Sequence, residues 1–145
     1  MSLFASPLSI DEGLVVAAIG RAESGTSGEI RVVISRKNIA DPISAAQEQF
    51  ERLGMTRTAA RNGVLIFLAP RSRTFAVIGD RGVHEKCSDL FWQELAAAMT
   101  TRFRTGDFTA GLVLGIERAG ALLAQHFPRG DDDHNELPDG IAKAD

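Results

Sequence analysis

The seven residues Gly63–Ala69, GVLIFLA, constrain the fold more than any other part of the sequence. All of them are apolar or glycine, Asn62 precedes them and Pro70 follows them. A short apolar run between two turn signals is typical of a central strand that is covered on both faces. The sequence therefore predicts a sheet with helices packed on both of its sides.

Two more strands are predicted around this one. Residues 29–35, EIRVVIS, alternate β-branched side chains and are typical of a strand. Residues 74–78, TFAVI, follow the central run after a short turn, so we expect the two to pair as an antiparallel hairpin. The first strand is separated from the central one by a helical segment, which predicts a parallel pair joined by a right-handed crossover.

Four helices are predicted from apolar residues that recur every three or four positions. The first helix follows Ser9, which we expect to be its N-cap. The second runs from Pro42, capped by Asp41, to Gly54. The third and fourth occupy residues 88–103 and 108–126. The order helix, strand, helix, strand, strand, helix, helix places the chain in the α/β class. We predict an α/β/α sandwich around a small mixed sheet, with helices on both faces.

The length and charge of the chain predict one domain, at residues 1–128, followed by an acidic flexible tail at 129–145. The last fifteen residues contain six acidic side chains and one lysine, whereas the rest is nearly neutral. Because no strongly basic face is expected, nucleic-acid binding is not predicted. The N-terminus does not resemble a signal peptide, and the apolar segment 110–124 is interrupted by Glu117 and Arg118. We therefore expect no direct membrane insertion and a cytoplasmic location.

Candidate functional residues gather around Gly79-Asp80-Arg81-Gly82, where a strand ends and a helical region begins. Several carboxylates at one mouth would suit a hard divalent cation such as Ca²⁺ or Mg²⁺. The candidate metal ligands are Asp80, Glu85, Asp89, Asp107 and Asn62. Glu29, which begins its strand, is expected at the opposite end of the sheet. The alternative is that Asp80 only caps a turn and the other carboxylates are solvated.

Catalytic groups are harder to name. Cys87 is the single cysteine, and His84 lies three residues before it. Such an i, i+3 neighbour on a helix rarely has the geometry to activate a thiol, and two ligands are too few for zinc. The residues alone therefore leave enzymatic activity open.

Six stretches in order give the chain a resemblance to the TPM domain family over about residues 8–128. They are SGEIRVVI (27–34), FERLGM (50–55), NGVLIFLAP (62–70), FAVIGDRGVHEK (75–86), the helix that contains Trp92, and FRTGDFTAGLVLGI (103–116). The ending NELPD (135–139) is similar to that of a short, soluble bacterial branch without a signal peptide or membrane anchor.

The resemblance implies an α/β/α sandwich, and for some members the binding of Ca²⁺ or a similar ion through acidic residues at loop ends. The family's usual Asp-Asn-Gly before the central strand is Arg61-Asn62-Gly63 in this chain, which replaces an anionic side chain by a cationic one. Asp80 in the neighbouring loop is the residue that could restore the negative charge.

Three functions follow from the residues and the resemblance together. The first is a non-catalytic accessory domain that binds a protein partner, acts in the maintenance of a protein complex and uses a divalent cation at the acidic loop. The second is a phosphatase that acts on phosphomonoesters, as described for one branch of the family. The third is a protein-interaction domain that needs no ion.

Overall fold

The computed structural model describes residues 9–130 and 140–144. The elements are, in chain order, α1 (Glu12–Glu23), β1 (Glu29–Ile34), α2 (Pro42–Arg52), the 3₁₀ helix η1 (Met55–Arg57), β2 (Gly63–Ala69), β3 (Thr74–Gly79), α3 (Arg81–His84), α4 (Asp89–Arg104), α5 (Phe108–His126) and β4 (Ile141–Lys143).

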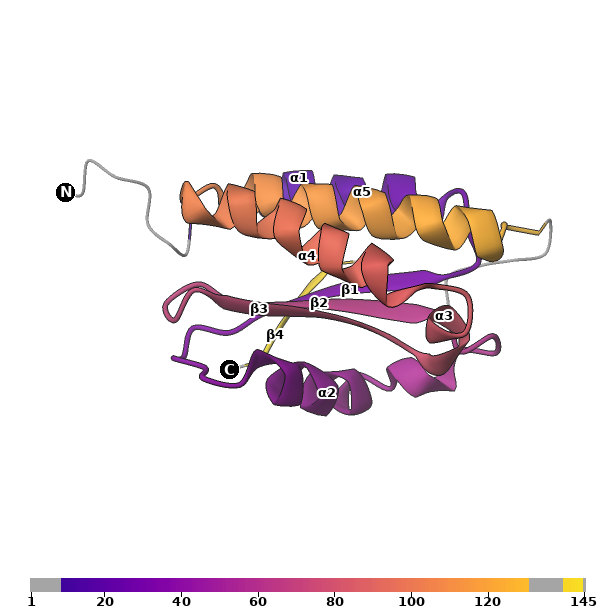
Figure 1. The fold of residues 1–145 in the computed structure, drawn as a ribbon, viewed down its shortest axis with the longest axis horizontal. Helices are drawn as coiled ribbons and strands as arrows, with labels where there is room; N and C mark the ends of the chain where they lie inside the picture. Colours follow the sequence, from indigo (N-terminus) through magenta and orange to yellow (C-terminus); the bar gives the residue numbers. More distant parts are fainter. Residues whose placement is uncertain (1–8, 131–139, 145) are drawn as a thin grey trace.

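The four strands form one mixed sheet in the order β3-β2-β1-β4. β1 is parallel to both β2 and β4, whereas β3 is antiparallel to β2. Helices α1, α4 and α5 cover one face of the sheet and α2 covers the other (Figure 1). The predicted α/β/α sandwich, the parallel crossover and the antiparallel hairpin are therefore confirmed.

The central strand β2 is buried along its whole length, as its composition predicts. Its alternate side chains enter two separate cores. Val64, Ile66 and Leu68 join the larger core under α1, α4 and α5. Leu65 and Phe67 join the smaller core against α2. Because β2 supplies both layers, the rest of the sheet is positioned relative to it.

Helix caps follow the sequence in one case and depart from it in another. Asp41 caps α2 by accepting a hydrogen bond from the Ser44 N–H at 3.1 Å, as expected. α1 is capped by Asp11, whose carboxylate accepts from the Leu14 N–H at 3.1 Å, so the prediction of Ser9 is wrong. Both residue types are good N-caps, and the sequence pattern does not separate two candidates two positions apart.

Part of the predicted flexible tail belongs to the sheet. Residues 141–143 form β4 and pair with Val32–Ile34 of β1, so the prediction is wrong for these three residues. Ile141 packs against the larger core and Ala142 against the smaller one. A strand of three residues is too short to show a recognisable apolar pattern. It could therefore not be predicted from the acidic composition of the tail. Residues 131–139 lie outside the described residues.

Candidate binding site

The end of β3 lies beside the beginnings of β1 and β2. In the register of the sheet, Gly79 is opposite Val64, and Gly63 is opposite Glu29. Asp80, which follows β3, therefore lies at the same end as Glu29. The expectation that Glu29 lies at the opposite end is wrong, because β3 runs against its neighbours and its last residue meets their first ones.

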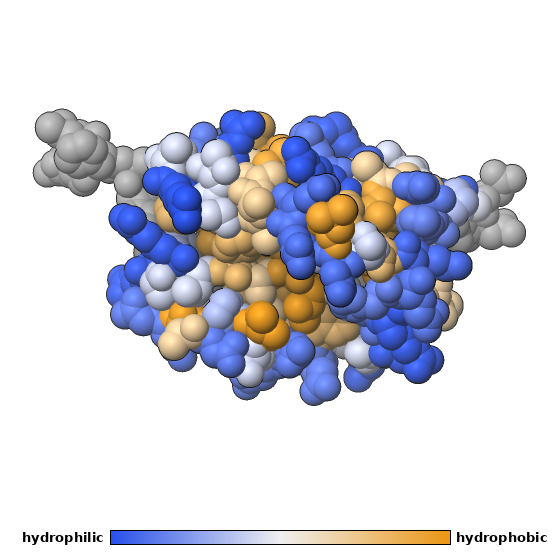
Figure 2. All heavy atoms as spheres, viewed as in Figure 1, coloured by the Kyte–Doolittle hydropathy of each residue, from blue (hydrophilic) through white to orange (hydrophobic). Residues whose placement is uncertain are grey.

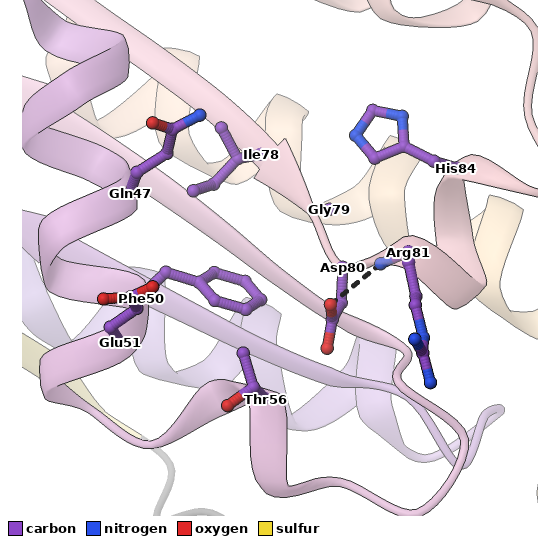
Figure 3. Close-up of a pocket in the computed structure, with 9 residues that line it drawn as sticks. All are labelled: Gln47, Phe50, Glu51, Thr56, Ile78, Gly79, Asp80, Arg81 and His84. Carbon is purple, nitrogen blue, oxygen red and sulfur yellow. Dashed lines mark hydrogen bonds between the residues drawn. The ribbon is translucent and has the colours of Figure 1, made fainter.

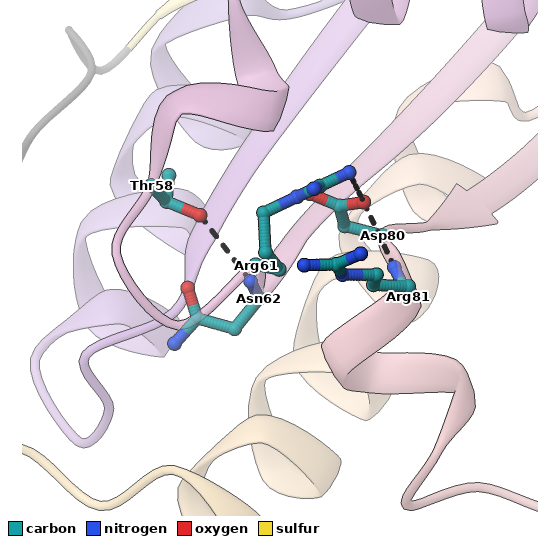
Figure 4. A network of polar contacts seen from close by, with 5 residues as sticks. All are labelled: Thr58, Arg61, Asn62, Asp80 and Arg81. Carbon is teal, nitrogen blue, oxygen red and sulfur yellow. Dashed lines mark hydrogen bonds and ion pairs between the residues drawn. The ribbon is translucent and has the colours of Figure 1, made fainter.

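Asp80 is almost completely buried, and both of its carboxylate oxygens are occupied. Its side chain is 6 % exposed, and Arg61 Nε lies 2.6 Å from Oδ2 while the second guanidinium contact, to Oδ1, is 2.8 Å. The Arg81 backbone N–H also donates to Oδ1 at 2.8 Å (Figure 4). The hydrogen bond and charge of Asp80 raise the pKa of Arg61, so the guanidinium stays charged. A bidentate pair of this kind is both strong and directional.

The local backbone brings these two side chains together. Arg61 adopts a left-handed conformation with φ of 52° in the turn before β2. Its carbonyl accepts a hydrogen bond from the Gly82 N–H at 2.9 Å, and the Asp80 N–H donates to the Gly63 carbonyl at 2.8 Å. A Cβ on Gly82 would lie 2.4 Å from the Ala60 carbonyl oxygen. The turn before β2 and the start of α3 are therefore in direct backbone contact.

The structure does not bring all the candidate metal ligands together. Asn62 immediately precedes β2 at the same end of the sheet as Asp80, and its side-chain amide donates to Ser27 Oγ at 3.2 Å. Glu85 and Asp89 are exposed around the start of α4.

Asp107 directly precedes α5, and α5 begins at the end of the domain away from α3 (Figure 1). It caps α5 by accepting from the Ala110 N–H at 2.9 Å, and it lines a second pocket together with Asp11. The sixteen residues of α4 separate Asp89 from Asp107, which corresponds to roughly 24 Å. Within residues 9–130 and 140–144, no three His, Cys, Asp or Glu side chains gather as a metal-binding group would require.

A pocket of about 460 Å³ opens beside Asp80, between α2 and the end of β3. The ring of Phe50 and the side chain of Ile78 supply its apolar surface (Figure 3). Its polar lining residues are Gln47, Glu51, Thr56, Asp80, Arg81 and His84. Sequence reasoning assigned Phe50 only to the core, because its helical spacing gives no sign that its ring also borders a cavity.

β3 is an edge strand: among the strands that the structure describes, it pairs with β2 alone. The Asp80 N–H bonds to the Gly63 carbonyl, so residues 74, 76 and 78 direct their backbone groups toward β2 in the alternating antiparallel pattern. The N–H and C=O groups of Phe75, Val77 and Gly79 consequently point toward the outer edge. They form a row of donors and acceptors that another strand could use.

Apolar side chains lie on both sides of this edge. Figure 2 shows a band of hydrophobic surface between α4 and α2, where β3 runs. Val77 and Ile78 are partly exposed, and the flanking helices also carry exposed apolar side chains, Leu90 on α4 (60 % exposed) and Ile43 on α2 (57 % exposed). An edge strand with unpaired backbone groups and apolar flanks is a surface suited to an added strand.

The fold and this site define a small α/β/α domain with one open sheet edge and a mixed polar and apolar pocket beside it. The profile of the TPM domain matches residues 8–122. The chain belongs to the TPM domain family, as the sequence motifs indicated.

Solved structures are similar over almost the whole chain. The NMR structure of the BA42 protein from the psychrophilic bacterium Bizionia argentinensis has 40% sequence identity and a TM-score of 0.87, covering 99% of this chain and 100% of that one. The N-terminal domain of the cg2496 protein from Corynebacterium glutamicum has 17% identity and a TM-score of 0.63, covering 88% and 82%. The N-terminal domain of a P. gingivalis protein has 17% identity and a TM-score of 0.61, covering 90% and 99%.

The latter two similarities show the fold alone. None of the curated proteins matches this chain. Across the described residues, no helix has both the length and the apolar character that crossing a membrane demands.

Proposed function

We propose that this chain is a non-catalytic accessory domain that binds an extended segment of a partner protein along the outer edge of β3. The observation that carries the proposal is the row of outward N–H and C=O groups at Phe75, Val77 and Gly79. Strand addition to such an edge obtains affinity from backbone hydrogen bonds and specificity from pockets for alternate side chains. A role in maintaining a protein complex would follow from recognition of one of its members.

The pocket beside Asp80 is placed to supply that specificity. Ile78 projects from β3 into the side of the sheet that α2 covers, where it borders the pocket together with Phe50. Side chains of an added strand alternate between the two faces of the sheet. One of them would therefore lie next to Ile78 and enter the pocket, and we expect it to be apolar.

We further propose that binding requires no divalent cation at Asp80, in contrast to the first of the three functions considered above. The Arg61 guanidinium already contacts both oxygens of the carboxylate. A Ca²⁺ or Mg²⁺ ion would have to displace a charged, bidentate partner from a buried group, and among the described residues no cluster of carboxylates surrounds Asp80 to compensate for that loss. Arg61 thus holds Asp80 in place as a bound cation would.

The edge is tested with a proline substitution. Val77→Pro removes the outward N–H without removing a bond to β2, and proline is tolerated at sheet edges for this reason. Val77→Ala is the matched control, because it shortens the same side chain and keeps the N–H. Peptides selected on the wild type from a random display library should bind Val77→Ala and not Val77→Pro, with both variants folded by their amide NMR spectra. Equal binding to both variants would refute strand addition at β3.

The ion is tested by titrating Ca²⁺ and Mg²⁺ while recording amide NMR spectra. The wild type should show no shifts in residues 61–63 and 79–81 at millimolar ion. Arg61→Gln should acquire such shifts because it leaves the carboxylate without its cation, whereas Arg57→Gln, the same change at an exposed neighbouring position, should not. Saturable shifts in the wild-type loop would contradict the ion-independent proposal.

A further inference from the structure

We infer that the segment recognised at β3 carries acidic residues next to the end of the strand that lies beside Thr74. This inference rests on the proposed strand addition and adds the chemistry of the partner. It comes from four arginines in the two segments next to the hairpin end of β3 and from the different charges at the other end of the strand.

Two of the arginines belong to the turn between β2 and β3. Arg71 and Arg73 are exposed, and Arg73 has a left-handed φ of 55°. The turn is closed by the Arg73 N–H, which donates to the Pro70 carbonyl at 3.2 Å. The guanidinium groups of Arg71 and Arg73 therefore lie in the turn that immediately precedes β3.

The other two arginines end α4. Phe103 packs edge-on against Phe75, with ring centroids 4.9 Å apart, so the last turn of α4 lies beside the first residues of β3. Arg102 and Arg104 flank Phe103 in the sequence and are exposed. Cations at a helix C-terminus are stabilised by the helix dipole, which explains why Arg102 and Arg104 end α4. The same reason does not apply to Arg71 and Arg73, because they do not lie at the end of a helix.

None of the four arginines forms an ion pair with an acidic side chain of the described part of the chain, where Arg61 binds Asp80 and Lys143 binds Glu12. Two acidic residues come close to this group: Asp107 follows Arg104 by three residues, and Asp41 follows Ile39, whose backbone hydrogen-bonds to Ser72 and Thr74. Asp107 accepts the Ala110 N–H at the start of α5. Asp41 accepts the Ser44 N–H at the start of α2. Each of these carboxylates therefore already serves a helix N-terminus.

The opposite end of β3 has charges of both signs. Asp80 is paired with Arg61, and the exposed residues that follow it include Arg81, Glu85 and Asp89. A partner segment would therefore meet positive charge at one end of the groove and mixed charge at the other. β3 spans six residues, or roughly 20 Å. The fitting partner has a β-forming core of about that length, with acidic residues just beyond the end beside Thr74.

Electrostatic pairing at such an exposed rim acts mainly on specificity and on the rate of association, and salt weakens it. The backbone hydrogen bonds along Phe75, Val77 and Gly79 supply the rest of the affinity. The two contributions are separable by mutation, since the arginines lie outside the strand.

The test uses a random peptide display library selected on the wild-type chain. The peptides recovered should have an excess of Asp and Glu on one side of an apolar, alternating core. The strongest should bind Arg71→Glu/Arg73→Glu about tenfold more weakly or worse, because charge reversal replaces attraction by repulsion. Arg57→Glu/Arg118→Glu changes the net charge equally at other exposed positions and should bind within about twofold of the wild type.

Failure of the inference and failure of the proposed function give different results. Peptides without acidic bias, or peptides that bind the Arg71/Arg73 variant as well as the wild type, would overturn the inference while the Val77→Pro effect persists. If Val77→Pro and Val77→Ala bind equally well, the strand-addition site itself is wrong and the inference fails with it.

Discussion

Replacing Gly82 by alanine should destabilise the domain, because the turn before β2 leaves no room for a side chain at this position. A Cβ there would lie 2.4 Å from the Ala60 carbonyl oxygen and 2.6 Å from that of Arg61. Ordinary C···O contacts are about 3.3–3.6 Å, so the two backbone segments would have to separate by roughly 1 Å. Both neighbouring atoms belong to the main chain, and rotation of a side chain cannot relieve the contact.

The cost follows from this displacement. Overpacking against a rigid neighbour costs roughly 1–3 kcal/mol. The same movement stretches the 2.9 Å hydrogen bond from the Gly82 N–H to the Arg61 carbonyl and shifts the arginine that holds Asp80. Alanine has a higher helix propensity than glycine, but in a helix of only four residues this stabilises the fold by about 1 kcal/mol at most. Weakening the hydrogen bond costs about as much as alanine gains, so we expect a net loss of roughly 1–3 kcal/mol in the free energy of unfolding.

The assay is urea unfolding of the wild type, Gly82→Ala and Gly20→Ala, followed through the single tryptophan, Trp92. Gly20 lies in α1, and a Cβ added there would meet no other side chain or packed segment within 4 Å, so alanine should raise stability by about 0.5–1 kcal/mol. In thermal unfolding of the same variants, the midpoint temperature should change by roughly 2–4 °C for each kcal/mol of change in the free energy of unfolding. If Gly82→Ala is as stable as the wild type while Gly20→Ala is stabilised, the close contact between the two segments does not exist.

Three further predictions concern other parts of the domain. Burial raises the pKa of the Cys87 thiol above its ordinary 9.0, so iodoacetamide at pH 8 should alkylate it more slowly in the folded chain than in urea. Because the folded state favours the neutral thiol, this contribution to stability is present below pH 9.0 and is lost as the pH rises through the higher folded-state pKa; Cys87→Ser should remove that dependence. Deleting residues 140–145 should lower stability by roughly 0.5–3 kcal/mol and speed amide exchange in β1, whereas unchanged exchange would exclude pairing with β4. Purified wild type and Asp80→Asn should hydrolyse p-nitrophenyl phosphate at the same background rate, and a rate that falls only in Asp80→Asn would favour the phosphatase alternative.

The layers of the fold could be predicted from the sequence because each depends on a strong local pattern. The uninterrupted run Gly63–Ala69 requires cover on both faces, and the structure places a core on each side of it. Asp41 followed by Pro42 defines the start of α2 at one residue. Where two acceptable caps compete, as at Ser9 and Asp11, the choice depends on tertiary contacts: the Asp11 N–H donates to Thr109 Oγ1 at 3.0 Å, across to α5.

The candidate site was less predictable, because it depends on which residues face one another. Asp80, Glu85 and Asp89 are close in sequence, and this proximity suggested a common ligand. The residue that contacts Asp80 is instead Arg61, nineteen positions away, brought close by the antiparallel return of β3. The available signal was Arg61 itself, at a position where the family resemblance led us to expect an acidic residue. It indicated that the charge balance had changed, but the pairing itself required the register of the sheet.

The outer edge of β3 could not be predicted from the sequence for a related reason. TFAVI predicts a strand but does not say whether that strand has one neighbour or two. The position of β3 follows from the sheet order, in which β1 and β4 continue the sheet on the other side of β2. An edge therefore becomes visible only when all the strands are placed.

Amide hydrogen exchange along β3, measured by NMR with and without a library-selected peptide, tests strand addition most directly. In the free chain the amides of Ala76 and Ile78 should be protected by β2, whereas those of Phe75, Val77 and Gly79 should exchange quickly. Binding should slow exchange at these three residues. Slow exchange at all five positions before any peptide is added, or no change at Phe75, Val77 and Gly79 when a peptide is bound, would contradict the account.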